Sequence, residues 1–287
     1  MRYEKRRSRA LLAAAALGLL LGGCEANFTA DLATDPPADP AITAVQVNLR
    51  GLEFRRSDGS TPTLKFNSGE LVDLMDLRDG DPLRVFTDEQ LPVGSYTGVR
   101  MLFDADEDDN AVAVGEDAFP LLLADGNFAE LDFRVEDEES SRESVTLVLD
   151  LRQSLALDEA DDEYTLTPRL RPTGTGDAAR IEGNVTVTCP AGTSLATGGA
   201  VYLFEGRDVD PDDIDGAGVE PFATTAVVDD GFGAFRYALR FLPRGNYTIA
   251  LTCRGEEDVV GESESLDFRN VGNLELDDGE VLLRDLN

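Results

Sequence analysis

The sequence predicts an all-β protein in which two β-sandwich domains follow a signal peptide and a tether. Short runs of alternating apolar and polar residues are separated by Gly, Asp, Asn or Pro at intervals of about ten residues, which is typical of antiparallel sandwiches. No segment keeps the 3.6-residue helical period for three turns. The chain has 287 residues, which is enough for two domains with substantial cores.

Residues 1–23 have the composition of a signal peptide. Five basic residues precede an apolar stretch from Ala10 to Gly23 that is too short to span a bilayer. The stretch Leu21-Gly22-Gly23-Cys24 resembles the lipobox of bacterial lipoproteins. An ordinary secretory peptide and a core helix are the alternatives.

The lipobox resemblance implies that Cys24 becomes the N-terminus of the mature protein and carries acyl chains. Several acyl chains hold a protein stably on a membrane, since each buried CH2 contributes about 0.8 kcal/mol. Glu25 stands where aspartate is the usual inner-membrane retention signal in enteric bacteria, which favours the outer membrane. We therefore expect a bacterial cell-envelope protein whose membrane contact is its N-terminal lipid.

Residues 24–40 are expected to form the lipidated end and a flexible tether. Three prolines and four acidic residues lie between Glu25 and Pro40, with little that could pack. A flexible chain of this length spans roughly 20 to 25 Å. The tether is therefore expected to lift the first domain clear of the membrane.

Residues 41–172 are predicted to form the first sandwich. Leu83–Leu91 and Asp158–Asp162 could each hold a helical turn without changing the fold class. The segments with strand-like alternation or an apolar run are Val45–Leu49, Leu64–Phe66, Leu71–Leu77, Val99–Phe103 and Val145–Leu151.

Five blocks of this domain, in this order, resemble the bacterial lipoprotein family catalogued as domain of unknown function 4382. The blocks span residues 42–47, 72–77, 91–100, 149–155 and 164–171. The family has no established activity, so the resemblance implies a fold and a cellular location but no reaction.

A linker at residues 173–178 is expected to lead into a second sandwich over residues 179–287. Arg236 and Arg240 lie on the face of one predicted strand that is opposite to its aromatic residues. The strands are predicted at 180–189, 199–205, 222–228 and 235–241, with two or three short acidic strands between Leu266 and Leu286.

The sequence L-P-x-G-x-Y-T occurs at Leu91–Thr97 and again at Leu242–Thr248. Pro fixes φ at the entry of a tight turn, Gly adopts conformations that other residues resist, and the Tyr enters the next strand with its ring inward. Around the second copy, residues 178–255 resemble transthyretin-like and carboxypeptidase-regulatory-like sandwiches. The repeat predicts two seven- or eight-stranded sandwiches of related shape.

Cys189 and Cys253 are predicted to form a disulfide. Both lie in predicted strands with period-two alternation, and each shares a face with the apolar residues of its strand. Both sulfurs therefore point into one core, and an exported chain meets an oxidising compartment. The alternative is two separate free thiols.

The composition excludes several function classes. Without the first 23 residues the chain has 20 basic and 56 acidic residues, a formal charge of −36. This charge repels nucleic acids and anionic lipid headgroups, and it is compatible with adaptation to high salt. The chain has no His, which excludes Ser/His, Cys/His and imidazole-metal sites.

Asp208, Asp210 and Asp212 are candidate calcium ligands in an acidic loop. Calcium takes six to eight oxygen ligands, and Asp at alternate positions on a turning backbone can supply them. An EF-hand is excluded because Asp213 stands where Gly is required and Val219 where Glu is required. A looser calcium site and a solvated acidic loop both stay open, and no other cofactor is expected.

The sequence is compatible with two hypotheses about function. The first is a non-catalytic, lipid-anchored binding or structural module of the envelope, whose ligand or partner the sequence does not identify. The second is a carboxylate-based hydrolase such as a glycosidase, which needs only two acids at the right separation. A hydrolase requires a cleft in which an acid with a raised pKa faces a second carboxylate, and the sequence shows no isolated acid within an apolar run.

Overall fold

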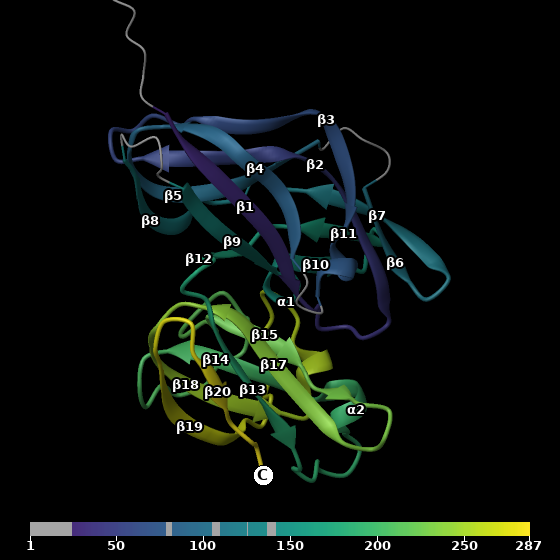
Figure 1. Ribbon diagram of the computed structural model, residues 1–287. Coiled ribbons are helices and arrows are strands. Elements are labelled where there is room, and N and C mark those ends of the chain that lie inside the picture. The colour runs from purple at the N-terminus through teal and green to yellow at the C-terminus, as the bar shows by residue number, and fades with distance from the viewer. Residues whose placement is uncertain (1–24, 79–81, 105–109, 125, 137–141) are drawn as a thin grey trace, which may run out of the picture.

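Two β-sandwiches packed end to end make up the computed structural model, which describes residues 25–78, 82–104, 110–124, 126–136 and 142–287 (Figure 1). The first sandwich holds strands β1 to β12, and the second holds β13 to β20. The all-β prediction is confirmed. The described helices are single turns, and none is long and apolar enough to cross a membrane. They are η1 (Leu74–Leu77), α1 (Leu151–Ser154), α2 (Leu195–Gly198) and η2 (Gly255–Glu257).

The first sandwich packs a four-stranded sheet against an eight-stranded sheet. The smaller sheet has the order β12 (Leu170–Gly174), β9 (Arg142–Asp150), β1 (Glu25–Asp35), β4 (Leu83–Pro92). The larger sheet has the order β10 (Leu155–Asp158), β11 (Glu163–Leu166), β7 (Asp117–Leu123), β6 (Ala111–Val114), β2 (Ile42–Arg56), β5 (Gly94–Phe103), β8 (Ala129–Val135). Its eighth strand, β3 (Thr63–Asp73), pairs with β2 outside this order. One continuous apolar core fills the space between the sheets.

The predicted flexible tether is wrong for Glu25–Asp35, because these residues form strand β1. The strand pairs in parallel with β9 on one side and antiparallel with β4 on the other. Phe28, Ala30 and Leu32 alternate along it and are buried in the first core. This alternation stabilises a strand although acids and prolines dominate the composition of the segment.

The helical turns suggested for two segments of the first domain are absent. Leu83–Leu91 lies in strand β4, whose Leu83, Phe86 and Leu91 pack against the core. Asp158–Asp162 spans the end of β10 and the turn to β11, and Asp158 Oδ1 accepts a hydrogen bond from the backbone N–H of Ala160 there. Cross-strand pairing in the sandwich outweighs the weak local helical preference of both segments.

The second sandwich packs two four-stranded sheets against each other. One has the order β16 (Val228–Asp229), β17 (Phe235–Leu242), β13 (Ala179–Val185), β20 (Val281–Leu283). The other has the order β15 (Ala223–Ala226), β14 (Ala200–Glu205), β18 (Gly245–Thr252), β19 (Arg269–Leu276). The predicted linker begins too early, because Thr173 and Gly174 still belong to strand β12 of the first domain.

The disulfide between Cys189 and Cys253 is confirmed, with their Cα atoms 5.8 Å apart. Cys253 directly follows β18, and Cys189 follows β13 in the opposite sheet. The bond therefore ties together the two sheets of the second sandwich beside its main core.

The two copies of the repeated sequence make the same corner in both domains. Each joins strands of opposite sheets: β4 to β5 in the first domain and β17 to β18 in the second. The Tyr96 hydroxyl donates to the carbonyl of Pro92 at 2.6 Å, and the Tyr247 hydroxyl donates to that of Pro243 at 2.8 Å. Both rings are buried, as the repeat predicts.

Replacing either corner tyrosine by phenylalanine is expected to destabilise the protein by about 1 to 3 kcal/mol, because a partly buried carbonyl loses its partner. Urea unfolding of Tyr96→Phe and Tyr247→Phe measures this cost. Tyr164→Phe is the control, since its ring is also buried but its hydroxyl makes no hydrogen bond within the described residues. Equal costs for all three variants would show that the corner bonds contribute nothing.

Candidate ligand-binding cleft between the two domains

Buried polar side chains of the first domain hold the second domain in place. Arg171 of β12 pairs with Asp35 at the end of β1 at 2.9 Å, and its Nη2 donates to the carbonyl of Arg240 at 3.1 Å. The Thr173 hydroxyl donates to the carbonyl of Phe241 at 2.9 Å. The bonds to Arg240 and Phe241 cross the domain boundary and are partly buried, so they fix the angle between the sandwiches.

A second set of buried contacts starts from Arg152 in α1. Its Nη1 donates to the Tyr202 hydroxyl at 3.3 Å and to the carbonyl of Gly255, both in the second domain. The Tyr202 hydroxyl in turn donates to Asp258. Burial raises the pKa of Tyr202 well above 10, and a nearby Asp258 acts in the same direction, so the phenol stays protonated and continues the chain of hydrogen bonds.

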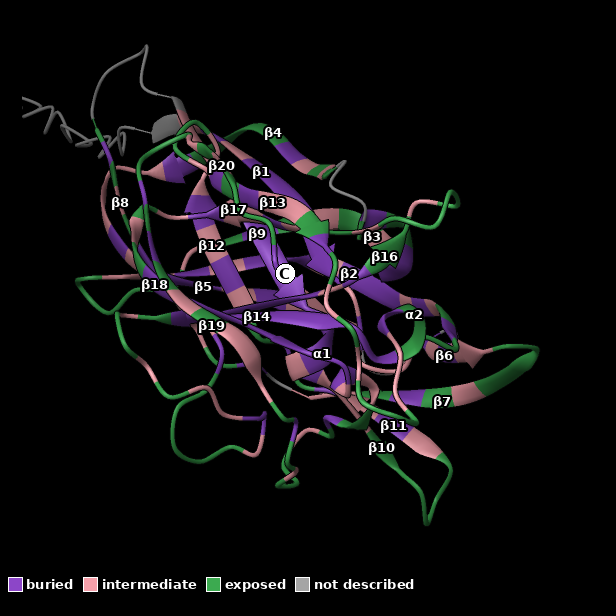
Figure 2. Ribbon diagram, turned by 90° about the horizontal axis from the view of Figure 1, so that it is seen from below, coloured by how far each residue is buried: buried purple, intermediate pink, exposed green. Residues whose placement is uncertain are grey.

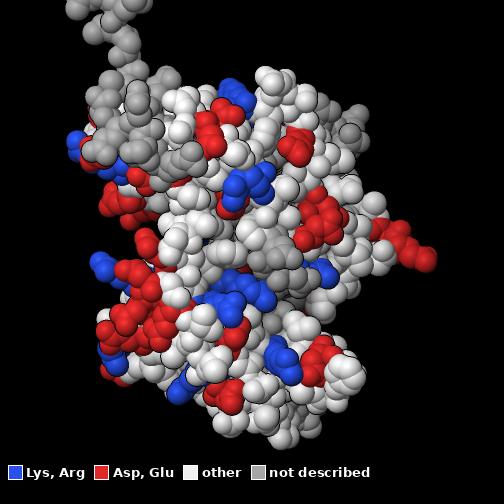
Figure 3. Space-filling model, viewed as in Figure 1, with Lys and Arg blue, Asp and Glu red and all other residues white. Residues whose placement is uncertain are grey.

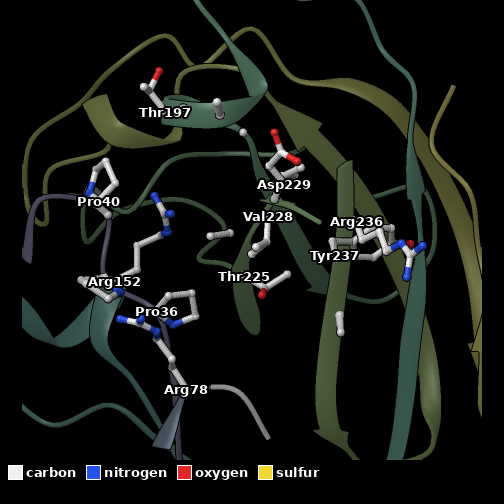
Figure 4. A pocket seen from close by; sticks show the side chains of 18 of the residues that line it. Pro36, Pro40, Arg78, Arg152, Thr197, Thr225, Val228, Asp229, Arg236 and Tyr237 are labelled. Carbon is white, nitrogen blue, oxygen red and sulfur yellow. The ribbon is translucent and has the colours of Figure 1, made fainter. Parts of the chain in front are cut away.

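A cleft of about 1050 Å³ lies beside this interface and is lined by both domains. The first domain supplies the proline-rich segment 36–40, Arg78 and Arg152. In Figure 4, Arg78 and Arg152 lie near Pro36 at one end, while Arg236 and Tyr237 lie at the other. The second domain supplies residues 182–184, 196–199, 225–229, Arg236, Tyr237, Ala238, Arg240, Glu256, Leu283 and Asp285.

The cleft has a higher ratio of basic to acidic residues than the whole chain, although its formal charge is −1. Four arginines and five acids line it: Arg78, Arg152, Arg236, Arg240, Asp39, Glu182, Asp229, Glu256 and Asp285. The whole sequence has 25 basic and 57 acidic residues. On the face shown in Figure 3, Lys and Arg gather at the waist between the two lobes, whereas Asp and Glu cover much of one side of the second domain.

Carboxyl groups with a raised pKa lie outside the cleft. Burial, helped by Asp150 and opposed by Arg171, raises the pKa of Asp35 to about 6. Asp35 adjoins only a cavity of about 10 Å³ next to the interface, which is too small for a sugar. Burial also raises the pKa of four further described carboxyls, none of which lines the cleft: Glu143, Glu220, Asp258 and Glu264.

The acidic loop between β14 and β15 has a structural role. Ile214 packs on Tyr202 and Phe204, so the loop covers the outer face of the sheet that contains β14. Figure 2 shows β14 buried along most of its length for this reason. Asp213 is also buried and accepts a hydrogen bond from the backbone N–H of Glu264.

The structure does not bring the candidate calcium ligands together. Asp208 is exposed and bonds to Asn273, with 2.7 Å from Asn273 Nδ2 to Asp208 Oδ1, and Asp212 accepts from the backbone N–H of Asp213 at 3.2 Å. Asp210 is exposed. Across the described ranges, no three acidic or Cys side chains converge on a point that could hold a metal ion.

We therefore expect calcium to raise the melting temperature no more than magnesium does at equal ionic strength. Both ions screen a chain of charge −36 to the same degree, whereas a specific site would add RT ln(1 + [L]/Kd) for calcium alone. Differential scanning fluorimetry of the native protein and Asp210→Asn makes the comparison. A calcium-specific rise that disappears in Asp210→Asn would restore the metal site.

The other site residues predicted from the sequence are the three cysteines. Cys189 and Cys253 are joined, while Cys24 and the signal peptide lie outside the described residues. Sequence reasoning did not find the cleft. Its only available signal was the outward face of β17, where Arg236 and Arg240 stand in a chain with few basic residues.

Comparison with known families identifies the first domain. Residues 29–168 match the family described as Domain of unknown function (DUF4382). The match begins within β1 and ends before β12. No curated protein shows significant similarity to the chain.

Proposed function

Residues 29–168 are a DUF4382 domain, and from this premise we propose that the protein is a non-catalytic envelope lipoprotein that binds a ligand between its two domains. Cys24 carries the lipid, preferentially in the outer membrane, and the interdomain cleft is the binding site. The second domain is proposed to be a transthyretin-like sandwich, supported by its two four-stranded sheets and its Tyr247 corner.

The cleft is the single observation that supports binding best. Its volume of about 1050 Å³ lies at the upper end of the range of small-molecule sites. Ligand sites also occur preferentially at domain interfaces. The interdomain bonds of Arg152, Arg171 and Thr173 keep the walls in place without a ligand, so binding costs little ordering of the protein.

The proposal is non-catalytic because the arrangement needed for a hydrolase has no support in the cleft. A glycosidase needs an acid with a raised pKa and a second carboxylate about 5 to 9.5 Å away across the substrate. The raised-pKa carboxyl of Asp35 faces Asp150 on the neighbouring strand, but both are buried in the interface. A hydrolase therefore stays the alternative, without an observation that favours it.

The position of β1 determines which end of the protein would lie at the membrane. Cys24 directly precedes Glu25, which already pairs with Pro92 at the end of β4. In Figure 1 this end of the first sandwich lies opposite to the second domain. A lipid on Cys24 would therefore hold the first sandwich close to the bilayer and point the second domain away from it.

Replacing Cys24 by alanine is expected to move the protein from the membrane fraction to the soluble fraction. The surface has no other strong attraction to anionic lipids, because the chain without its signal peptide carries a formal charge of −36. Fractionation with a high-salt wash checks this result. A Cys24→Ala protein that stays in the washed membranes would contradict lipid anchoring.

Binding in the cleft can be tested by filling it. Ala196 is exposed and lines the cleft, whereas Ala191 is exposed five positions away and does not line it. We expect an extract of small molecules from the producing cell's envelope to raise the melting temperature of the native protein and of Ala191→Trp, but not of Ala196→Trp. Equal shifts in all three proteins would place binding elsewhere, and no shift in any would contradict binding.

A further inference from the structure

We propose that the cleft recognises a small molecule by an anionic group, a carboxylate or a phosphate, held by Arg78, Arg152 and Arg240. This inference rests on the proposed binding function and names the chemical class of its ligand. The three arginines come from three separate segments: the end of η1, helix α1 and strand β17. The fold brings them to one cleft.

Arg152 is a buried cation without a carboxylate partner. Only 3% of the residue is exposed, yet it lines the cleft. Nη1 is used by Tyr202 and Gly255, but Nε is buried without any hydrogen-bond partner, and within the described chain no carboxylate lies within 4.0 Å of the guanidinium. A buried guanidinium with unused donors is costly unless an anion completes its hydrogen bonds.

Arg78 and Arg240 lie next to each other at the same interface. Both line the cleft and also the small cavity beside Asp35. Neither forms an ion pair with any residue that the structure describes, and the nearby Asp35 is already paired with Arg171 at 2.9 Å. By contrast, the fourth cleft arginine, Arg236, pairs with Asp230 at 3.3 Å.

Four of the five acids in the cleft already have partners. Glu182 pairs with Arg180 at 3.4 Å, and three aspartates accept backbone hydrogen bonds. These are Asp39 from Ala41 at 2.8 Å, Asp229 from Gly231 at 2.8 Å and Asp285 from Asn184 at 2.8 Å. The exception is Glu256, whose Oε2 is buried without a partner in the described structure.

The unused arginine donors favour an anion as the ligand group. Within the described residues, Arg78, Arg152 and Arg240 have no carboxylate partner, and Glu256 is the one cleft acid with neither an arginine partner nor a backbone hydrogen bond to its side chain. Arginine is the side chain best suited to carboxylate and phosphate, because its donors form a planar fork that binds two oxygens at once. The apolar wall of Pro36, Pro37, Ala226 and Val228 suits an apolar body attached to that group.

The test compares phenyl phosphate and benzoate with uncharged benzyl alcohol as a probe of similar size. We expect at least one anion, and not the alcohol, to raise the melting temperature above a sodium chloride control of equal ionic strength. The anion that gives the larger shift identifies phosphate or carboxylate as the preferred group. The shift is expected to shrink as sodium chloride is raised from 0.1 to 1 M.

Variants then assign the effect to the named arginines. Arg78→Gln and Arg240→Gln together are expected to weaken the apparent anion affinity by about tenfold or more. Arg244→Gln, an exposed arginine that pairs with Asp278 outside the cleft, is expected to change it less than twofold. Arg152 is left unchanged because it also supports the domain interface.

The outcomes separate this inference from the proposed function. No anion-specific shift, or a shift that survives in the double variant, overturns the anionic class. The proposed binding function stands if an uncharged compound from the envelope extract raises the melting temperature of the native protein but not that of Ala196→Trp. It fails if no compound in the extract raises the melting temperature of the native protein.

Discussion

Leu32→Asp is expected to leave the first sandwich unfolded. Leu32 is 1% exposed in β1, between its neighbours Leu83 of β4 and Leu147 of β9. An aspartate there loses the packing of a buried leucine and places a carboxylate in an apolar core, at a cost of about 5 kcal/mol or more. That cost approaches the whole stability of a typical domain.

The control for this variant lies on the same strand. Thr29 is only half-buried, and its hydroxyl accepts from the backbone N–H of Asp88 at 3.3 Å. Thr29→Asp keeps an acceptor there, so we expect it to cost less than about 1 kcal/mol. Circular dichroism and urea unfolding distinguish the two variants. A Leu32→Asp protein as stable as Thr29→Asp would mean that residues 25–35 behave as the tether the composition suggested.

Arg171→Met is expected to destabilise the protein by about 3 to 5 kcal/mol at pH 7.5, because it leaves the buried carboxylate of Asp35 without its cation. The loss should also weaken the contact between the domains, since Nη2 of Arg171 donates to the carbonyl of Arg240. The methionine fills much of the same volume, so the effect reports mainly on charge.

The cost of Arg171→Met is expected to fall as the pH is lowered through about 6. The folded-state pKa of Asp35 is raised from 3.8 to about 6, so the native protein is most stable when Asp35 is protonated and loses that contribution as the pH rises from about 4 to about 6. Removing Arg171 raises this pKa further, because the arginine lowers it. The additional cost therefore appears above about pH 6.

Urea unfolding at pH 5.0 and pH 7.5 measures this dependence. Arg171→Met/Asp35→Asn is the paired variant, in which the orphaned carboxylate is removed, and it should recover part of the stability at pH 7.5. Arg180→Met is the surface control, because Arg180 and Glu182 are both exposed. A cost for Arg171→Met that is equal at both pH values would contradict the role assigned to Asp35.

Local patterns predicted the sandwiches because the information lies within a few residues. Alternation predicted β2 and β18, and the L-P-x-G-x-Y-T sequence predicted a tight turn before a strand and that the rings of Tyr96 and Tyr247 point inward. The Cys189–Cys253 pairing followed from the faces of two strands. In each case the turn or strand is specified by its own residues.

The features that sequence reasoning missed depend on contacts between distant segments. Composition predicts a tether over the residues of β1, because prolines and acidic residues dominate residues 25–40, although the family match begins at residue 29 within this strand. The cleft depends on Arg78, Arg152 and Arg240, which are far apart in sequence and meet only through the domain interface. A charge count over the chain cannot show which arginines lack carboxylate partners.

Native mass spectrometry of the mature protein after exposure to an envelope extract tests the binding function most directly. We expect one small-molecule adduct per chain in the native protein and in Ala191→Trp, and its loss in Ala196→Trp, because only Ala196 lines the cleft. A native protein that appears only at its own mass, or an adduct that persists equally in Ala196→Trp, would contradict ligand binding between the two domains.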